Sequence, residues 1–358
     1  MNIKSLLIGS AAALVAVSGA RAADAIVAAP DPEPVEYVRV CDAAGTGYFY
    51  IPGTETCLRI HGYVRYDAGF GDLNGKVSDT GDDTWNKRAR ASFRVSTWSA
   101  TDMGDLKTYV ETRWQYDTNG NGATYSTAGE FSINFAYIQL GGLRIGKDES
   151  AFTTYLGYAG SVINDCGNGC YGPFDTNLIS YTFTGGNGFS AIIAFEQGDG
   201  SPGWLIDDYV PHVVAGIGFE QGWGSIKAVV GYDTRDGAGR GGWAAKVRGD
   251  FNITDGVSAF VMVGYGENSS GYTAWATGAG ETIAVWAGAS AKFSDNVTGN
   301  IQVGWTEGNG ALDDIWAVAA NVNYTVVPGF VVTPEVQWVR DTSGTSQWGG
   351  VVRFQRSF

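Results

Sequence analysis

The chain has 358 residues, which is room for two ordinary domains or for one large β-structure. Glycine (53 residues) and aromatic side chains (13%) are abundant, while charged residues make up only 17%, and this mix favours many short strands and turns over helices. Acidic residues outnumber basic ones by 37 to 23, which argues against nucleic acid as a partner, because nucleic-acid-binding proteins concentrate positive charge.

Residues 1–22 are predicted to form a secretory signal peptide. Lys4 precedes the apolar run LLIGSAAALVAV, and Ala20-Arg21-Ala22 supplies the small-residue pattern of a cleavage site. The run is too short to span a bilayer and is followed by polar, proline-rich chain, which disfavours the alternative of a retained membrane anchor. We therefore expect export, with cleavage after Ala22.

Residues 23–56 are predicted to form an extended lead-in segment, because prolines stand at positions 30, 32 and 34. The four cysteines lie as two local pairs, Cys41 with Cys57 and Cys166 with Cys170, and neither pair has the His or further Cys of a zinc site. An oxidising compartment favours disulfides, and free or intermolecular thiols are the alternative. The second bridge would close a very short loop and would shape that loop rather than stabilise the whole protein.

Residues 57–358 alternate between apolar and polar side chains in segment after segment, which is the period of a strand with one apolar face. In CLRIHGYVRYDAGF the polar face carries Arg59 and Arg65, and in KRARASFRVSTW it carries Arg88, Arg90 and Arg94. The pattern continues to the terminal strand, whose apolar face carries Phe354 and Phe358. Counting such segments predicts sixteen strands.

The links between these segments alternate in length. Seven are short, such as Gly141-Gly142 and Val327–Gly329, and eight others are mostly longer, such as Gly71–Asn86 and Asp148–Asn177. Tight turns at one end and long loops at the other predict an all-β fold, a 16-stranded antiparallel transmembrane β-barrel over residues 57–358. A soluble β-sandwich or propeller explains the alternation along strands but not the alternating link lengths.

Several stretches resemble the outer-membrane general porins of alphaproteobacteria, of the rhizobial type. They include PEPVEYVRVCDAAGTGYFYIPGTETCLRIHGYVRYD, FAYIQLGGLRIGKDESAF, VPGFVVTPEV and WGGVVRFQRSF, and the resemblance covers nearly the whole mature chain and weakens in the long links. It implies a homotrimeric sixteen-stranded barrel in the outer membrane of a Gram-negative bacterium, and passive diffusion of small hydrophilic solutes and ions. It also implies that the third long loop, after GLRIGKDESAF, folds inward to narrow the pore.

The end of the chain resembles the sorting signal that the barrel assembly machinery reads in outer-membrane proteins. We assign this signal to Phe354 and Phe358. The pattern of that signal favours an aromatic or apolar residue two places before the end, where this chain has Arg356, which can snorkel at the boundary. Loop carboxylate pairs such as Asp82-Asp83 would bind divalent cations at the level of lipopolysaccharide or would simply be solvated, and the sequence does not separate the two.

A pore constriction is predicted from the cost of charge in lipid. An arginine on the lipid face costs about 2–4 kcal/mol near mid-bilayer, so the polar faces of the first three strands must line the lumen. They form a basic wall of Arg59, Arg65, Arg88, Arg90, Arg94 and Arg113. The long link that follows carries Asp148, Glu149, Asp165 and Asp175, and folding it inward would set carboxylates against guanidinium groups across water. The alternative is that these arginines form ordinary ion pairs in the barrel wall.

Motifs for catalysis and cofactors are weak. Gly237–Gly242 matches a dinucleotide fingerprint by letter, but a strand follows it rather than a helix. His61 and His212 lack the nucleophile and carboxylate of a hydrolase. We therefore expect no enzyme activity, no cofactor and no metal. Two alternatives to a general porin stay open: a channel that prefers oligosaccharides, and a plugged barrel that acts as an adhesin or structural anchor.

Overall fold

The computed structural model describes residues 38–119, 126–200 and 203–358. The predicted signal peptide, residues 1–22, and residues 23–37 of the predicted lead-in lie outside the described residues. Residues Val40–Phe358 form one compact unit. No helix in the described ranges is long and apolar enough to cross a membrane.

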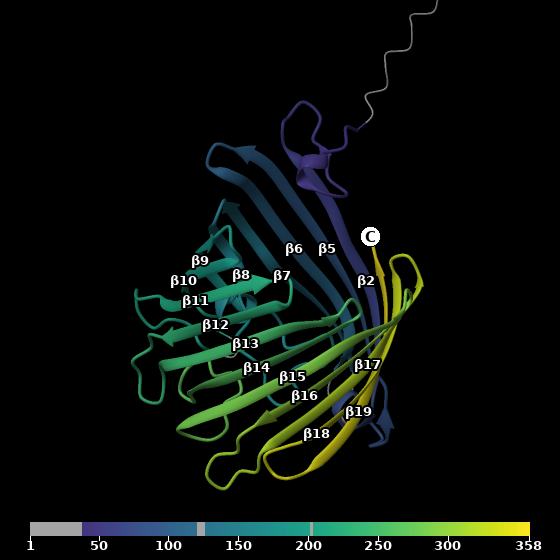
Figure 1. Ribbon diagram of the computed structural model, residues 1–358. Coiled ribbons are helices and arrows are strands. Elements are labelled where there is room, and N and C mark those ends of the chain that lie inside the picture. Colours follow the sequence, from purple (N-terminus) through teal and green to yellow (C-terminus); the bar gives the residue numbers. More distant parts are fainter. Residues whose placement is uncertain (1–37, 120–125, 201–202) are drawn as a thin grey trace, which may run out of the picture. The chain divides into compact units, whose positions relative to one another are not determined.

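Sixteen antiparallel strands of the described chain pair in sequence order and close on themselves, because the last strand pairs with the first (Figure 1). The prediction of a sixteen-stranded antiparallel barrel is therefore confirmed. The strands are β2 (Cys57–Phe70), β5 (Asn86–Thr101), β6 (Gly104–Asn119), β7 (Ser126–Leu140), β8 (Leu143–Glu149), β9 (Asp175–Thr184), β10 (Phe189–Glu196), β11 (His212–Gln221), β12 (Gly224–Asp233), β13 (Gly242–Thr254), β14 (Val257–Glu267), β15 (Glu281–Ser294), β16 (Val297–Thr306), β17 (Ile315–Val327), β18 (Phe330–Arg340) and β19 (Ser346–Ser357).

The closing seam between β19 and β2 extends to Phe358. β19 pairs with β2 from Gly350 opposite Phe70 to Ser357 opposite Tyr63. The backbone of Phe358 then exchanges two hydrogen bonds with Gly62, at 3.0 and 3.1 Å. The last residue is thus part of the sheet, and its peptide groups are satisfied by a partner strand rather than by water.

The seven predicted short links are present as tight turns, and the longer links lie at the other strand ends. The smaller elements lie before the barrel or within the long links: η1 (Asp42–Ala44), β1 (Phe49–Tyr50), α2 (Gly71–Asn74), β3 (Lys76–Val77), β4 (Asp83–Thr84) and α3 (Ala151–Thr154). Three short turns are preceded by register shifts, after Asn252, Lys292 and Thr325. Such bulges at a barrel rim bend the strand and increase its twist.

The two faces of the wall differ in the way that the alternation predicted. Outward positions carry exposed apolar side chains, such as Val64, Phe93 and Ile179. Inward positions carry polar, covered side chains, such as Ser92 of β5 and Glu111 of β6, which are 2% and 1% exposed. An apolar exterior and a polar interior are what a barrel surrounded by lipid requires.

The link between β8 and β9, residues 150–174, is called the inner loop below. It contacts the inward-facing side chains of β13, β15, β16, β17 and β18, far from its own strands along the sheet. Its apolar residues join a buried cluster with side chains of β10 to β15 and of the links between these strands. The large members include Phe152, Tyr171, Trp204, Tyr272, Trp275 and Trp286. The inner loop therefore packs on one sector of the inner wall and leaves the sector of β2, β5 and β6 polar.

Candidate functional site

The six predicted arginines lie on three neighbouring strands, β2, β5 and β6, and are called the arginine wall: Arg59, Arg65, Arg88, Arg90, Arg94 and Arg113. Arg65 stands directly opposite Arg90 in the β2–β5 register, and Arg94 stands opposite His61. Like charges opposite each other repel, so this register requires counter-charges.

Two buried carboxylates supply those counter-charges. Asp67 accepts hydrogen bonds from Arg88 at 2.7 Å and from Arg353 of β19 at 2.8 Å. Glu111 binds Arg94 at 2.8 Å and Arg113 at 2.6 Å. Neither carboxylate, nor Arg353, was among the residues predicted for the site. The alternation of the strands was a usable signal for Asp67 and Glu111, because it places both on the same inward face as the arginines. Arg353 comes beside β2 only when the barrel closes.

Five wall arginines surround one hollow of about 440 Å³. Its lining residues include Arg59, Arg65, Arg90, Arg94 and Arg113, together with Gln355 and Ser357 of β19. Arg88 is not among them and binds Asp67 instead. The structure therefore brings five of the six predicted cations to a common space.

The four predicted acidic residues are more dispersed. Asp148 belongs to β8 and binds Arg144 at 2.7 Å, while Asp175 begins β9 and pairs with Lys147. Glu149 accepts the hydroxyl hydrogen bond of Tyr158, and its charge also acts on Arg113 of the wall.

Asp165 lies within the inner loop and accepts a hydrogen bond from the Tyr171 hydroxyl at 2.8 Å. Burial raises the pKa of this carboxyl above its ordinary value, and the Tyr171 bond opposes the rise. Among the four predicted acidic residues, Glu149 thus has the clearest electrostatic link to the wall.

Inward-facing side chains fix the inner loop in place at several points. The Glu335 carboxylate accepts the backbone N–H groups of Ile163 and Asn164 and the side-chain amide of Asn321. Asn168 donates to the carbonyl of Trp305 and the hydroxyl of Thr306. A Cβ on Gly304 would lie 1.9 Å from the Asn168 oxygen, so any other residue there would force the Asn168 side chain to shift.

The start of the inner loop is held by a second buried carboxylate. Glu196 accepts hydrogen bonds from the Ser150 hydroxyl, the Ala151 N–H and the Tyr272 hydroxyl. Lys246 donates to the carbonyl of Tyr171 and lies 4.4 Å from the centre of the Phe152 ring. These contacts hold the inner loop against the lumen wall.

Both cysteine pairs form disulfides. Cys166 and Cys170 close a turn of the inner loop, with Cα atoms 4.4 Å apart. Cys41 and Cys57 join the segment before the barrel to the first residue of β2.

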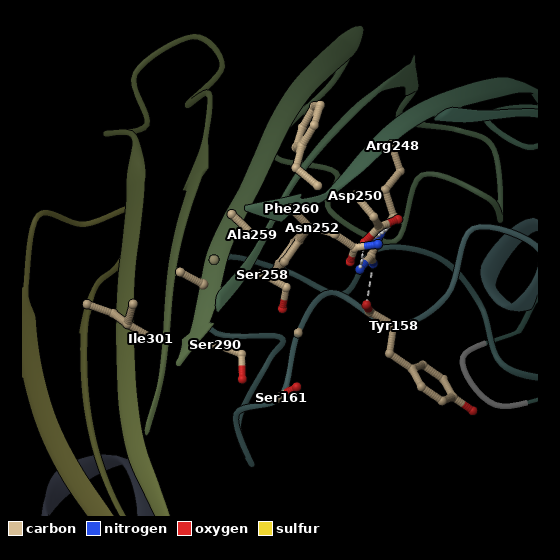
Figure 2. Close-up of a pocket in the computed structure, with 14 residues that line it drawn as sticks. Tyr158, Ser161, Arg248, Asp250, Asn252, Ser258, Ala259, Phe260, Ser290 and Ile301 are labelled. Carbon is tan, nitrogen blue, oxygen red and sulfur yellow. Dashed lines mark hydrogen bonds and ion pairs between the residues drawn. The ribbon is translucent and has the colours of Figure 1, made fainter. Parts of the chain in front are cut away.

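A second hollow, of about 410 Å³, lies between residues 158–161 of the inner loop and the wall of β13–β16 (Figure 2). Arg248 is the cation there, and it binds Asp250 and donates to the carbonyl groups of Gly157 and Tyr158. Figure 2 shows the hydroxyls of Ser161, Ser258 and Ser290 around the same space. This hollow is polar, and its one cation is matched by one carboxylate.

The two histidines lie in different settings. His61 faces the arginine wall, and His212 is buried against Trp204, whose carbonyl lies 2.7 Å from Nε2. Within residues 38–119, 126–200 and 203–358, no group of three or more His, Cys, Asp or Glu side chains is placed to hold a metal ion.

A comparison with protein families finds that residues 24–353 match the porin subfamily. The chain belongs to this porin subfamily. It is 51% identical to the porin Omp2b of Brucella neotomae, and the alignment covers 100% of both chains. The porin is therefore an outer-membrane channel protein of a Gram-negative bacterium.

Solved structures share the fold of this porin. The outer-membrane channel DcaP of Acinetobacter baumannii is 18% identical, with a TM-score of 0.65 over 86% of this chain and 99% of that one. OmpF of Salmonella typhi is 12% identical, with a TM-score of 0.61 over 86% and 99%. At such identities the likeness concerns the barrel alone.

Proposed function

We propose that this porin lets small hydrophilic solutes and ions diffuse passively through a constriction between the arginine wall and the inner loop. The observation that carries the proposal is the asymmetry of the lumen. One sector of the wall holds clustered arginines around an open hollow, and the opposite sector is covered by the anchored inner loop. Fixed charge on one side of a water-filled passage favours polar, orientable solutes and selects among ions.

Ion selectivity tests the wall directly. Arg88→Ser with Arg90→Ser removes two positive charges, and the fold should tolerate it. Asp67 keeps Arg353 when Arg88 is lost, and Arg90 binds the neutral amide of Gln115 and no described carboxylate. We expect the reversal potential in a salt gradient to move toward cation preference. Lys292→Ser is the control, because Lys292 pairs with Asp295 in a short turn. A double variant that conducts with the wild-type reversal potential would remove the wall from the constriction.

The assembly state is proposed to be a homotrimer. The outer-membrane protein OmpT of Vibrio cholerae, which shares this fold with a TM-score of 0.58, is described in a trimer form. This chain adds its own argument. Lys147 and Asp175 form an ion pair on the strand faces that also carry the outward Ile145 and Ile179.

A charged pair in contact with lipid is costly, so cover by a neighbouring subunit is expected at that place. Crosslinking and gel mobility without boiling should show a species three times the monomer mass. A monomer under both conditions would contradict the trimer.

The terminal strand is proposed to be the assembly signal, and a cleaved signal peptide over residues 1–22 to precede it in export. Phe354 and Phe358 are both exposed on the outward face, at 40% and 59%. Replacing Phe358 with Ser should leave more protein unassembled in the periplasm, and the measurement is the membrane-inserted fraction. Lipid and lipopolysaccharide would then surround the barrel, with the long links at the outer surface.

A further inference from the structure

The hollow formed by Arg59, Arg65, Arg90, Arg94 and Arg113 is called the arginine hollow, and its guanidinium groups outnumber the carboxylates that form ion pairs with them. Within the described residues, the ion pairs of the wall arginines end on Asp67 and Glu111 alone, and Arg353 of β19 also binds Asp67. Five guanidinium groups therefore share these two carboxylates, and Arg59 and Arg90 form no ion pair with a carboxylate in the described part of the chain. The imbalance is local, because the whole chain has an acidic surplus.

Three arginines of the hollow lack a carboxylate of their own. Arg90 donates twice to the neutral Gln115 side chain, at 3.0 and 2.5 Å. Arg59 forms no ion pair with a described carboxylate and lies near the Tyr48 ring. Arg65 is 3.9 Å from Asp67, which two other arginines bind more closely, and its buried Nε has no hydrogen-bond partner.

Such a group of cations favours an anion from outside the chain. Guanidinium groups present paired N–H donors that match the oxygens of phosphate and carboxylate groups, and these charge-assisted bonds are stronger than neutral ones. We propose that the arginine hollow is a saturable binding subsite for small oxyanions with two negative charges, such as phosphate or a short dicarboxylate. The proposal rests on the proposed channel function and names a solute class for it.

The second hollow shows that this charge pattern is not general in the lumen. There Arg248 is bound by Asp250 through Nε and Nη2 and is covered by two loop carbonyls (Figure 2). That hollow offers hydroxyl groups and no spare positive charge. An oxyanion should therefore bind on the side of β2, β5 and β6 and not beneath the inner loop.

Equilibrium dialysis of labelled phosphate against the folded, detergent-purified protein measures the site without relying on conduction. The measurement is made at low salt, where screening is weak because the Debye length exceeds about 10 Å. The test variant is Arg90→Gln, which removes one charge and leaves no carboxylate without a partner. The control is Lys227→Gln, which removes a cation that pairs with Glu220 outside the hollow.

The wild type and Lys227→Gln should bind phosphate to saturation, and Arg90→Gln should bind it about tenfold more weakly, the factor for 1.4 kcal/mol. Succinate should compete and acetate should not at equal ionic strength. Non-saturable binding, equal binding by Arg90→Gln, or equal competition by acetate would each overturn the subsite.

Conductance of the same preparations separates this result from the proposed function. A protein that conducts but binds no phosphate would overturn the subsite alone. A protein that binds phosphate but does not conduct would overturn the channel function and leave the subsite standing.

Discussion

Glu335 is predicted to be the main anchor of the inner loop, and Glu335→Ala tests it. The side chain is 2% exposed and binds two backbone N–H groups of the loop, from Ile163 and Asn164, as well as Asn321. Removal leaves these donors without their acceptor. A donor left unpaired costs about 1–3 kcal/mol, so two loop donors give about 3 kcal/mol after allowance for water in the lumen. The equilibrium for loop release should then rise about 100-fold.

The expected phenotype is a mobile loop in an intact barrel. Single-channel recordings of Glu335→Ala should show more current noise and more brief closures than the wild type, and the loop should be cut faster by protease. The matched control is Glu130→Ala, because Glu130 is also a lumen carboxylate but accepts its hydrogen bond from Gln115. Wild-type noise and wild-type proteolysis in a folded Glu335→Ala barrel would refute the anchoring argument.

Two further predictions address the lipid face and the pH dependence. Phe93 is 42% exposed on the outward face of β5, so Phe93→Arg should cost about 2–4 kcal/mol near mid-bilayer and lower the inserted fraction, while Phe93→Leu should insert normally. Normal insertion of Phe93→Arg would contradict the assignment of faces. Burial raises the pKa of Asp165, so its charge lowers stability at neutral pH, and this loss disappears as the pH falls through the raised pKa. Asp165→Asn, which keeps an acceptor for Tyr171, should therefore denature at a higher temperature than the wild type at neutral pH. This difference in denaturation temperature should shrink as the pH is lowered. A difference that grows in acid would contradict the prediction.

The sequence predicted the barrel well because its controlling signals are local. Successive side chains of a strand point to opposite faces, so Phe93 and Arg94 are assigned to opposite faces without knowledge of any distant contact. Short links rich in glycine mark the turns for the same reason. Even the pairing of the last strand with the first follows from strand number and closure.

The site was predicted less completely because its contacts join residues far apart in the chain. Parity places Arg88 and Asp67 on inward faces, but only the register between β2 and β5 shows that they pair. Nothing local indicates that Gly304 makes room for Asn168, or that Glu335 binds the backbone of residues 163 and 164. The sequence places the predicted acidic residues in a long link, whereas the structure assigns Asp148 and Asp175 to strand ends, where each has its own basic partner.

We infer that an open, water-filled passage runs beside the arginine wall, and recording from single purified proteins in a planar lipid bilayer is the test of this passage. The structure predicts stepwise increases in current as each protein inserts, with a steady open level. The Arg88→Ser, Arg90→Ser variant should keep those steps while its reversal potential shifts toward cations. A folded, membrane-inserted protein that produces no current steps would contradict the claim.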